Sequence, residues 1–469
     1  MMNRRKFIQF GVVSSALTLA NAQQSNNSPT YNSFTTKLII PKILEPDSLA
    51  NGLKHYTLTV QEGKKRFFKN RETFTYGING NYLGPTLRVK NKETLKMLVN
   101  NQLKEETVIH WHGLKIPGIH DGGPSRAILP KQSWNTSLSV NQRASMCWYH
   151  PHSHKTTGRQ VYMGLAGLIL IDDEESLSLN LPNNYGLDDI PLVLQDRRFD
   201  SEGQFVYKQS MHDTMMGVTG DIQLINGVID PLLNVDAKVV RLRILNGANA
   251  RIYSLAFNNE LTFYQIAGDS SLLPNSVALK SLILSPGERA EILVDLSNMQ
   301  GQELYLGDKL NNKALLKIKV NDKVRNMGII PEQLTTVNEY NNALPLNKRE
   351  FTINMNMMFL GINNKKMNLN RIDEEVSLGV TELWRIKNPQ RHAHPFHIHG
   401  CSFKILTRNG KAPYSNELGL KDTVLLYSNE VVEILVKFEH KASKKYPYMY
   451  HCHILEHEDA GMMGQFTVV

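Results

Sequence analysis

A motif that recurs along the chain constrains the fold more than any other feature of the sequence. The segment INGNYLGPTLRVKNKETLKMLVNN begins at Ile78, and the similar segment INGVIDPLLNVDAKVVRLRILNG begins at Ile225. A third and weaker copy, EVSLGVTELWRIKN, ends at Asn388. Three copies predict three similar domains in the 469 residues, because a single hydrophobic core stops growing at roughly 250 to 300 residues.

The repeated segments have the pattern of β-strands. Alternating or β-branched residues occur at 86–89, 95–99, 239–245 and 431–436, and turn residues punctuate the chain throughout. Long helical periodicity is scarce. The sequence therefore predicts an all-β protein built from β-sandwiches.

Shifts in composition suggest where the domains meet. The stretch 172–184 is acidic and polar, and the stretch 321–347 is polar and rich in asparagine. We expect three domains, at 23–175, 176–325 and 326–469.

The first 22 residues predict an export signal. Arg4 and Arg5 precede an apolar stretch at 8–19, and an Ala-Asn-Ala sequence follows at 20–22. Paired arginines, a short apolar region and an Ala-x-Ala site are typical of a twin-arginine signal peptide, cleaved here before Gln23. No later segment has 18 consecutive apolar residues, so we expect a periplasmic protein without stable membrane insertion.

The net charge of +9 comes from basic residues scattered along the chain. The denser spots, such as 64–66, are short, and no basic stripe interleaved with aromatic residues accompanies them. We therefore expect solvated surface and no nucleic-acid partner.

Ten of the sixteen histidines fall into four short clusters. These are HWH at His110 and His112, HPH at His150 and His152, HPFHIH at His394, His397 and His399, and HCHILEH at His451, His453 and His457. Residues i and i+2 of a strand point to the same face, so each HxH pair presents two imidazoles to one metal centre. Eight imidazoles from two domains suit a multinuclear site of a borderline metal such as copper.

Cys452 stands between the two histidines of the last pair and so points to the opposite face, toward a different metal. His457 follows five residues later, and Met462 five residues after that. With His394 they supply two imidazoles, a thiolate and a thioether, the ligand field of a blue-copper electron-transfer site. Met463 is the alternative axial ligand, and the regular spacing favours Met462.

The other two cysteines, Cys147 and Cys401, each lie within three residues of a clustered histidine. An exported protein with so few cysteines does not depend on a disulfide framework. A bridge between these two is an open alternative, and it requires a Cα separation of about 5.5 Å.

The four clusters resemble, in order and spacing, the copper-binding signatures of the multicopper oxidases. The likeness covers nearly the whole chain and is closest to three-domain bacterial members, cuprous oxidases and laccases, in HWHGLKIPGIHDGGP, GRQVYMGLAGLILIDDE and HPFHIHG. It implies cupredoxin-like Greek-key domains, four copper ions, and four one-electron oxidations coupled to the reduction of dioxygen to water. One chain closes such a site, so a monomer is expected.

The resemblance also implies a ligand set for each copper. Type 1 copper takes His394, Cys452, His457 and Met462; type 2 copper takes His110 and His397; the type 3 pair takes His112, His150, His152, His399, His451 and His453. Cys452 with its neighbours is then the electron route. Asp121 and Glu458 match proton-relay positions, although a plain Asp-Gly turn and a solvated carboxylate are the respective alternatives. His154 is expected to lie behind the ligands.

The reducing substrate stays open between Cu(I) and a phenol or aromatic amine. Gln390 and His392 stand where cuprous oxidases have an acidic and a thioether residue, and a long Met-rich insertion is missing. The methionines at 211–216 and 355–358 fit either core packing or a substrate copper. A role in copper tolerance is expected; the alternative is a copper-free cupredoxin scaffold of the cell envelope, which the twelve intact ligand positions disfavour.

Overall fold

A computed structural model describes residues 33–469 except 51–52, 325–327, 341–343 and 357–358. The predicted signal peptide and two methionines of the second group, Met357 and Met358, lie outside the described residues. Strands dominate the described chain and its few helices are short, which confirms the all-β fold class.

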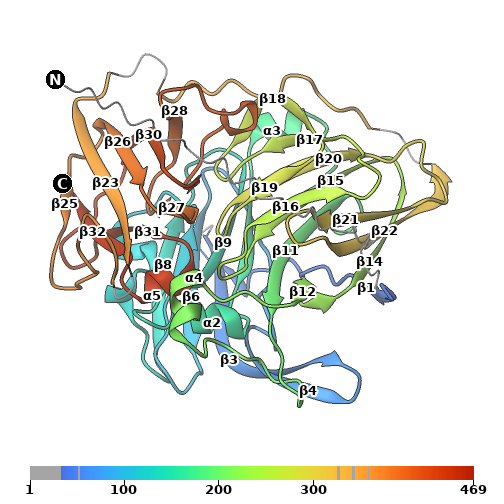
Figure 1. Ribbon diagram of the computed structural model, residues 1–469, viewed down its shortest axis with the longest axis horizontal. Coiled ribbons are helices and arrows are strands. Elements are labelled where there is room, and N and C mark those ends of the chain that lie inside the picture. Colours follow the sequence, from blue (N-terminus) through green and yellow to red (C-terminus); the bar gives the residue numbers. More distant parts are fainter. Residues whose placement is uncertain (1–32, 51–52, 325–327, 341–343, 357–358) are drawn as a thin grey trace, which may run out of the picture.

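Six sheets are arranged as three pairs, which we call the first, middle and last sandwiches (Figure 1). One sheet of the first sandwich contains β2 (Ser48–Ala50), β3 (Leu53–Phe68), β6 (Thr94–Asn101) and β8 (Ser133–Ser139), with β4 (Arg71–Ile78) paired to β3. The other runs β5 (Leu87–Lys90), β10 (Gly167–Asp172), β9 (Ser145–Pro151) and β7 (Ile109–His112).

The middle sandwich pairs a seven-stranded with a six-stranded sheet. The former runs β13 (Val228–Ile229), β12 (Ile222–Ile225), β11 (Asp189–Arg197), β15 (Val239–Asn246), β20 (Arg289–Asp295), β17 (Phe263–Ala267) and β18 (Leu272–Leu279). The latter runs β1 (Thr36–Lys37), β14 (Pro231–Ala237), β22 (Lys313–Val324), β21 (Glu303–Asp308), β16 (Tyr253–Phe257) and β19 (Leu282–Leu284).

The last sandwich consists of two five-stranded sheets. The first runs β24 (Phe359–Ile362), β23 (Asn347–Asn356), β26 (Thr381–Asn388), β30 (Glu430–Lys437) and β28 (Phe403–Arg408). The second runs β25 (Glu374–Val376), β32 (Met463–Val468), β31 (Tyr448–Cys452), β27 (His394–Ile398) and β29 (Thr423–Leu426). The domain boundaries given above stay predictions.

Short helices connect the strands. They are α1 (Gly118–Asp121), α2 (Thr157–Met163), α3 (Glu174–Ser178), α4 (Met211–Met216), α5 (Leu455–Asp459) and the 3₁₀ turns η1 (Pro124–Arg126) and η2 (Ser415–Glu417). Helix α5 packs against α2 and α4, and the three lie together at the lower left of Figure 1. Among the described residues, none of the helices combines the length and apolar character needed to cross a membrane.

An asparagine at the same place in each sandwich explains the repeat in structural terms. Asn101, Asn246 and Asn388 end equivalent strands, β6, β15 and β26. In each case the side-chain amide donates to backbone carbonyls of other segments, and the side-chain oxygen accepts the N–H two residues later. The repeated asparagine therefore fastens the strand end to neighbouring loops, satisfying buried carbonyls that strand pairing leaves free.

Replacing Asn246 with alanine should lower the thermal stability of the protein. The substitution removes the side-chain donor to the buried carbonyl of Leu284 and to the part-buried carbonyl of Arg251, and a buried group left unsatisfied costs about 1 to 3 kcal/mol. Thermal unfolding followed by circular dichroism measures the effect. Asn183→Ala, in an exposed loop, is the control, and an equal shift for both variants would contradict the assigned role.

Candidate metal centre

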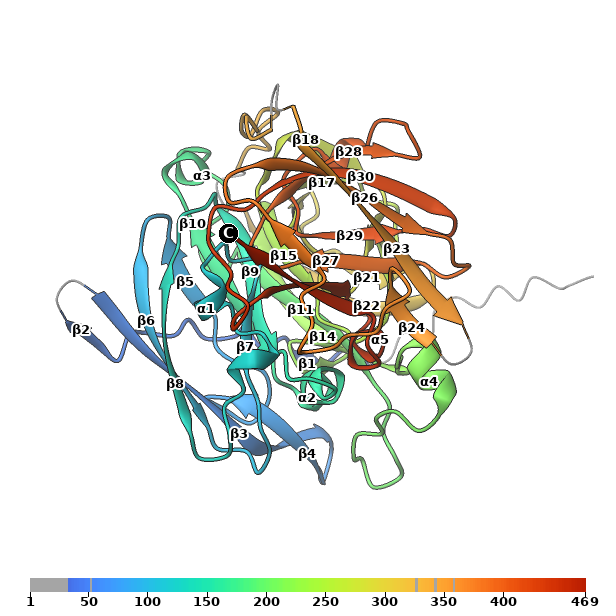
Figure 2. The same cartoon turned by 90° about the vertical axis from the view of Figure 1, so that its left-hand side faces the viewer.

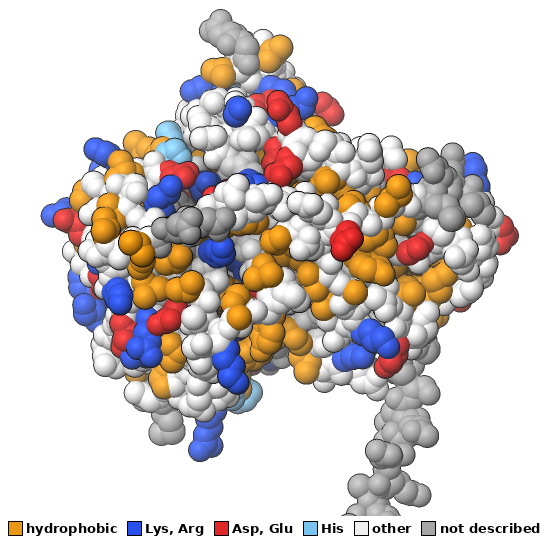
Figure 3. Space-filling model, turned by 90° about the horizontal axis from the view of Figure 1, so that it is seen from above, with side chains coloured by type: hydrophobic (Ala, Val, Ile, Leu, Met, Phe, Trp, Pro, Cys, Tyr) orange, Lys and Arg blue, Asp and Glu red, His pale blue; other side chains and the backbone are white. Residues whose placement is uncertain are grey.

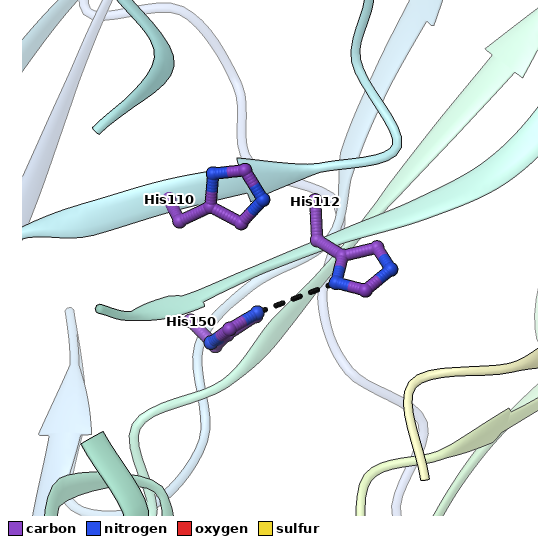
Figure 4. A group of neighbouring side chains, drawn as sticks. All are labelled: His110, His112 and His150. Carbon is purple, nitrogen blue, oxygen red and sulfur yellow. Dashed lines mark hydrogen bonds between the residues drawn. The ribbon is translucent and has the colours of Figure 1, made fainter. Parts of the chain in front are cut away.

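Two paired strands of the first sandwich place three histidines side by side. Strand β7 carries His110 and His112, and β9 carries His150, which is paired directly with His110. Figure 4 shows the three rings gathered around one space, with Nε2 of His150 3.4 Å from Nδ1 of His112. His152 follows β9 and is also buried. The β7–β9 register therefore delivers four buried imidazoles to one edge of the sheet.

The last sandwich supplies the other four imidazoles in the same way. His397 on β27 is paired with His451 on β31, and His399 and His453 follow these strands directly. All four side chains are buried. The ring of His397 on β27 lies against that of His110 on β7, and the ring of His451 on β31 lies against that of His152. Figure 2 shows β7, β9 and β27 in the central part of the molecule.

The two sets of histidines interleave. The rings of His110 and His399 stack with centroids 3.8 Å apart, and the rings of His112 and His397 stack at 3.7 Å. Nε2 of His451 lies 3.3 Å from Nε2 of His152 and 3.2 Å from Nε2 of His399. Eight imidazoles predicted from four separate motifs thus form one buried cluster.

The nitrogen atoms of this cluster fit metal ions. Nε2 of His110, Nε2 of His397 and both ring nitrogens of His453 are buried and have no hydrogen-bond partner among the residues that the structure describes. Burial lowers the pKa of His112, His150, His152, His397, His399, His451 and His453, which favours the neutral form that binds metal. Neutral imidazoles whose nitrogen atoms converge on one another are typical of a metal site rather than of a packed core.

Hydrogen bonds on the outer side of the rings fix which nitrogen faces inward. Nδ1 of His110 donates to the backbone oxygen of Asp121 at 3.0 Å, and Nδ1 of His397 donates to that of Asp422 at 2.8 Å. His112 is reversed, because its Nε2 lies 3.1 Å from Oδ1 of Asp422 and leaves Nδ1 facing the cluster. Such partners set the tautomer and orientation of a metal-binding histidine.

A second potential metal site lies on the other face of β31. The Sγ atom of Cys452 is 3.5 Å from Nδ1 of His394 and 3.5 Å from Nδ1 of His457, and all three residues are buried. Met462 belongs to the hydrophobic core that contains Cys452, whereas Met463 begins β32 and is paired with His451. Burial raises the pKa of the Cys452 thiol, so the isolated side chain is held as a thiol until a cation is bound.

Both predicted acidic residues contact the histidine cluster. Oδ2 of Asp121 accepts a hydrogen bond from Nδ1 of His399 at 2.8 Å, and its Oδ1 is buried with no partner in the described part of the chain. Oε2 of Glu458 lies 3.2 Å from Nδ1 of His451. Burial raises the pKa of the Glu458 carboxyl well above its usual value. The two carboxyl groups therefore reach the cluster from different sides.

The structure also bears on residues near the clusters that the sequence left open. His154 is half-buried and joins none of the possible metal-binding groups among the described residues. Cys147 and Cys401 are both free, so the alternative of a disulfide between them was wrong. His392, which stands where cuprous oxidases have a thioether residue, is exposed.

The sequence interpretation missed Asp422 and Thr423. Asp422 is fully buried, and it forms a possible metal-binding group with His112 and His397. The hydroxyl of Thr423 lies 3.3 Å from Nε2 of His112 and 3.1 Å from Nδ1 of His397. The available signal was the charged pair Lys421–Asp422 directly before the apolar run of β29, since charged residues are rarely buried unless paired.

Two sequence models described as multicopper oxidase match the chain, over residues 59–176 and 334–469. Multicopper oxidase mco of Staphylococcus epidermidis is 39% identical over 458 residues, which cover 96% of this chain and 97% of that protein. The chain belongs to the multicopper oxidase family. The laccase-like multicopper oxidase CueO of Ochrobactrum sp., described with activity towards lignin model compounds and lignosulfonate, superimposes with a TM-score of 0.86 and is 40% identical, covering 92% of this chain and 100% of that one.

A protein named for a different role is also similar to this multicopper oxidase. The cell division protein FtsP of Escherichia coli is 33% identical over 486 residues, covering 100% of this chain and 99% of that protein. Family membership implies copper, dioxygen and a reducing substrate, and the solved laccase-like neighbours support an oxidoreductase.

Proposed function

We propose that this protein is a copper-containing oxidase that passes four single electrons from a small reducing substrate to dioxygen and forms water. The observation that carries the proposal is the paired geometry around Cys452. Its thiol faces two imidazoles on one side of β31, and the histidines before and after it face six further imidazoles on the other. Such an arrangement connects an electron-accepting centre to an oxygen-reducing centre through one short piece of backbone.

The ligand sets follow the sequence interpretation. His394, Cys452, His457 and Met462 would hold type 1 copper; His110 and His397 would hold type 2 copper; His112, His150, His152, His399, His451 and His453 would hold the type 3 pair. When bound, the copper ions supply the one-electron redox steps. Four ions match the four electrons that dioxygen requires.

The chain contributes orientation, water exclusion and protons. The ring nitrogens are directed inward by the backbone oxygens of Asp121 and Asp422, and the buried surroundings keep bulk water out. Reduction of dioxygen to water consumes four protons. The carboxyl groups of Asp121 and Glu458, each within 3.2 Å of a histidine nitrogen, are positioned to pass them inward.

Electrons would enter where His457 approaches the surface. Its Nε2 donates to the backbone oxygen of Met215 at 2.9 Å, and Met215 lines a cavity of about 120 Å³. Met211, Phe359 and Leu360 also line this cavity, and Lys366 is the one charged residue among the described residues that line it. The apolar lining favours a phenol or aromatic amine as the donor over an anionic complex, while Cu(I) remains the second candidate because thioethers also line the cavity.

The surroundings proposed for the enzyme are those that the sequence suggested: the periplasm, after twin-arginine export, with one chain per active unit and a role in copper tolerance. The two metal sites lie within a single chain, which supports the monomer. In the view of Figure 3 basic and acidic side chains are intermixed across the surface.

A copper-free scaffold of the cell envelope is the second candidate, and the similarity to the cell division protein FtsP supports a role other than oxidation. The two differ in metal content and turnover. The copper-loaded protein should consume oxygen with at least one of Cu(I), Fe(II) and a phenol, measured side by side with an oxygen electrode. Absence of uptake with all three donors, in protein that contains its full copper, would contradict the oxidase and favour the scaffold.

A further inference from the structure

The middle sandwich holds none of the predicted copper ligands, yet one of its loops forms a wall of the histidine cluster. This loop, residues 285–288, connects β19 to β20 and reads Ser-Pro-Gly-Glu. Gly287 lies against the ring of His453, so closely that a Cβ atom there would stand 2.8 Å from Cδ2 of the imidazole. Its φ of +83° is also one that glycine tolerates and other residues rarely adopt.

Arg289, the first residue of β20, directly follows this loop and is fully buried. Each of its three guanidinium nitrogens donates a hydrogen bond. Nη1 and Nη2 donate to Oδ1 and Oδ2 of Asp422 at 2.7 and 2.5 Å, forming a bidentate pair across two sandwiches. The remaining donors reach the backbone oxygens of Met146, Gly287 and Asp269 at 2.7, 3.1 and 2.9 Å. These contacts fix the plane of the guanidinium, and with it the plane of the Asp422 carboxylate.

Asp422 passes this orientation to two histidines of the cluster. Its Oδ1 lies 3.1 Å from Nε2 of His112, and its backbone oxygen accepts from Nδ1 of His397 at 2.8 Å. The rings of these two histidines stack on each other. One aspartate held by one guanidinium therefore contacts a ligand from the first sandwich through its carboxylate and a ligand from the last through its backbone oxygen.

The first sandwich packs closely against the ion pair at Gly113. Gly113, the residue after the HWH motif, has a φ of +91°, and a Cβ atom there would stand 2.7 Å from Nη2 of Arg289 and 3.0 Å from Oδ2 of Asp422. The glycine thus allows the first sandwich to close over the guanidinium. Sequence segments from all three sandwiches meet at this single ion pair.

We propose that Arg289 is a positioning residue for the oxygen-reducing copper cluster, through which the ligand-free middle sandwich orients His112 and His397. The inference rests on the proposed function, since it assigns Arg289 a role toward that cluster. A purely structural ion pair would stabilise the fold without any specific effect on the cluster.

Arg289→Lys in the copper-loaded full-length protein distinguishes these roles. Lysine keeps the positive charge and loses the planar, bidentate fork. We expect the blue absorption of type 1 copper to be retained, the type 2 electron paramagnetic resonance signal to change, and the affinity of the cluster for copper to fall by roughly 10- to 100-fold, as judged by copper retained during dialysis against a chelator. Oxygen consumption should fall with the lost copper.

Arg243→Lys is the matched control. Arg243 is equally buried in the middle sandwich and forms bidentate hydrogen bonds with Asp189 at 2.5 and 3.0 Å. It should lower the midpoint of thermal unfolding while leaving copper retention and the type 2 signal as in the wild type.

The outcomes separate the two proposals. If Arg289→Lys retains copper and the type 2 signal of the wild type, the positioning role is overturned. Parallel loss of type 1 and cluster copper, as a general folding defect would produce, overturns it as well. Wild-type protein that holds all its copper but consumes no oxygen contradicts the proposed function alone, because copper retention still reports on Arg289.

Discussion

Cys452→Ser is expected to remove the blue colour of the copper-loaded protein and to stop oxygen consumption. Among the described contacts, the Cys452 thiol is the one sulfur ligand that lies 3.5 Å from Nδ1 of both His394 and His457. A serine hydroxyl is a poor substitute for such a soft thiolate ligand. The same substitution removes the sulfur atom that would link type 1 copper to the backbone leading to His451 and His453. Electrons would then have no short route to the cluster.

The cluster itself should survive this change. Its eight histidines lie on the opposite face of β31 or on other strands, so Cys452→Ser should retain the type 2 electron paramagnetic resonance signal and lose about one copper ion per chain. Cys401→Ser is the control, because Cys401 is another buried, free cysteine of the last sandwich. Turnover that persists in Cys452→Ser would refute the assignment of the electron route.

Glu458→Gln is expected to slow turnover by roughly 100-fold or more while the blue colour is unchanged, in line with the usual contribution of a positioned proton donor. The amide has the shape of the carboxyl group and cannot deliver its proton. Oε2 of Glu458 lies 3.2 Å from Nδ1 of His451 and Oε1 lies 3.7 Å from Nδ1 of His152, so the loss occurs beside the cluster. Steady-state oxygen uptake at saturating donor measures it.

Glu456→Gln provides the comparison on the same helix. Glu456 is also buried, but its carboxylate accepts hydrogen bonds from Tyr207, Asn249 and the backbone of Val218, away from the cluster. This variant should lose thermal stability and retain turnover. If both variants slowed turnover equally, α5 as a whole rather than the Glu458 carboxyl would be responsible.

Local patterns explain how much of the site could be predicted from the sequence. A strand alternates its side chains between two faces, so the HxH pairs and the reversed Cys452 are readable from spacing alone, and the structure places all of these side chains on the predicted faces. The repeat was equally local. Asn246 and its counterparts mark the end of one strand in each sandwich, which is why three copies of a weak motif predicted three sandwiches.

Contacts between sandwiches could not be predicted in this way. Arg289 and Asp422 are far apart in the chain and carry no common spacing, and their significance lies in a bidentate pair that only the packing of three sandwiches creates. The reducing substrate could not be predicted from the sequence for the same reason. The cavity beside Met215 is built from α4, β24 and the residue after α5, whose approach depends on the whole fold.

The interleaving of His110 with His399 and of His112 with His397 also determines when metal can be inserted. The ribosome makes the first sandwich long before it makes His451 and His453, and domains generally fold in the order of synthesis. The four cluster imidazoles of the first sandwich therefore lack the full set of partners from the last sandwich until translation has passed Met462. We therefore expect copper loading of both proposed sites to follow completion of the last sandwich.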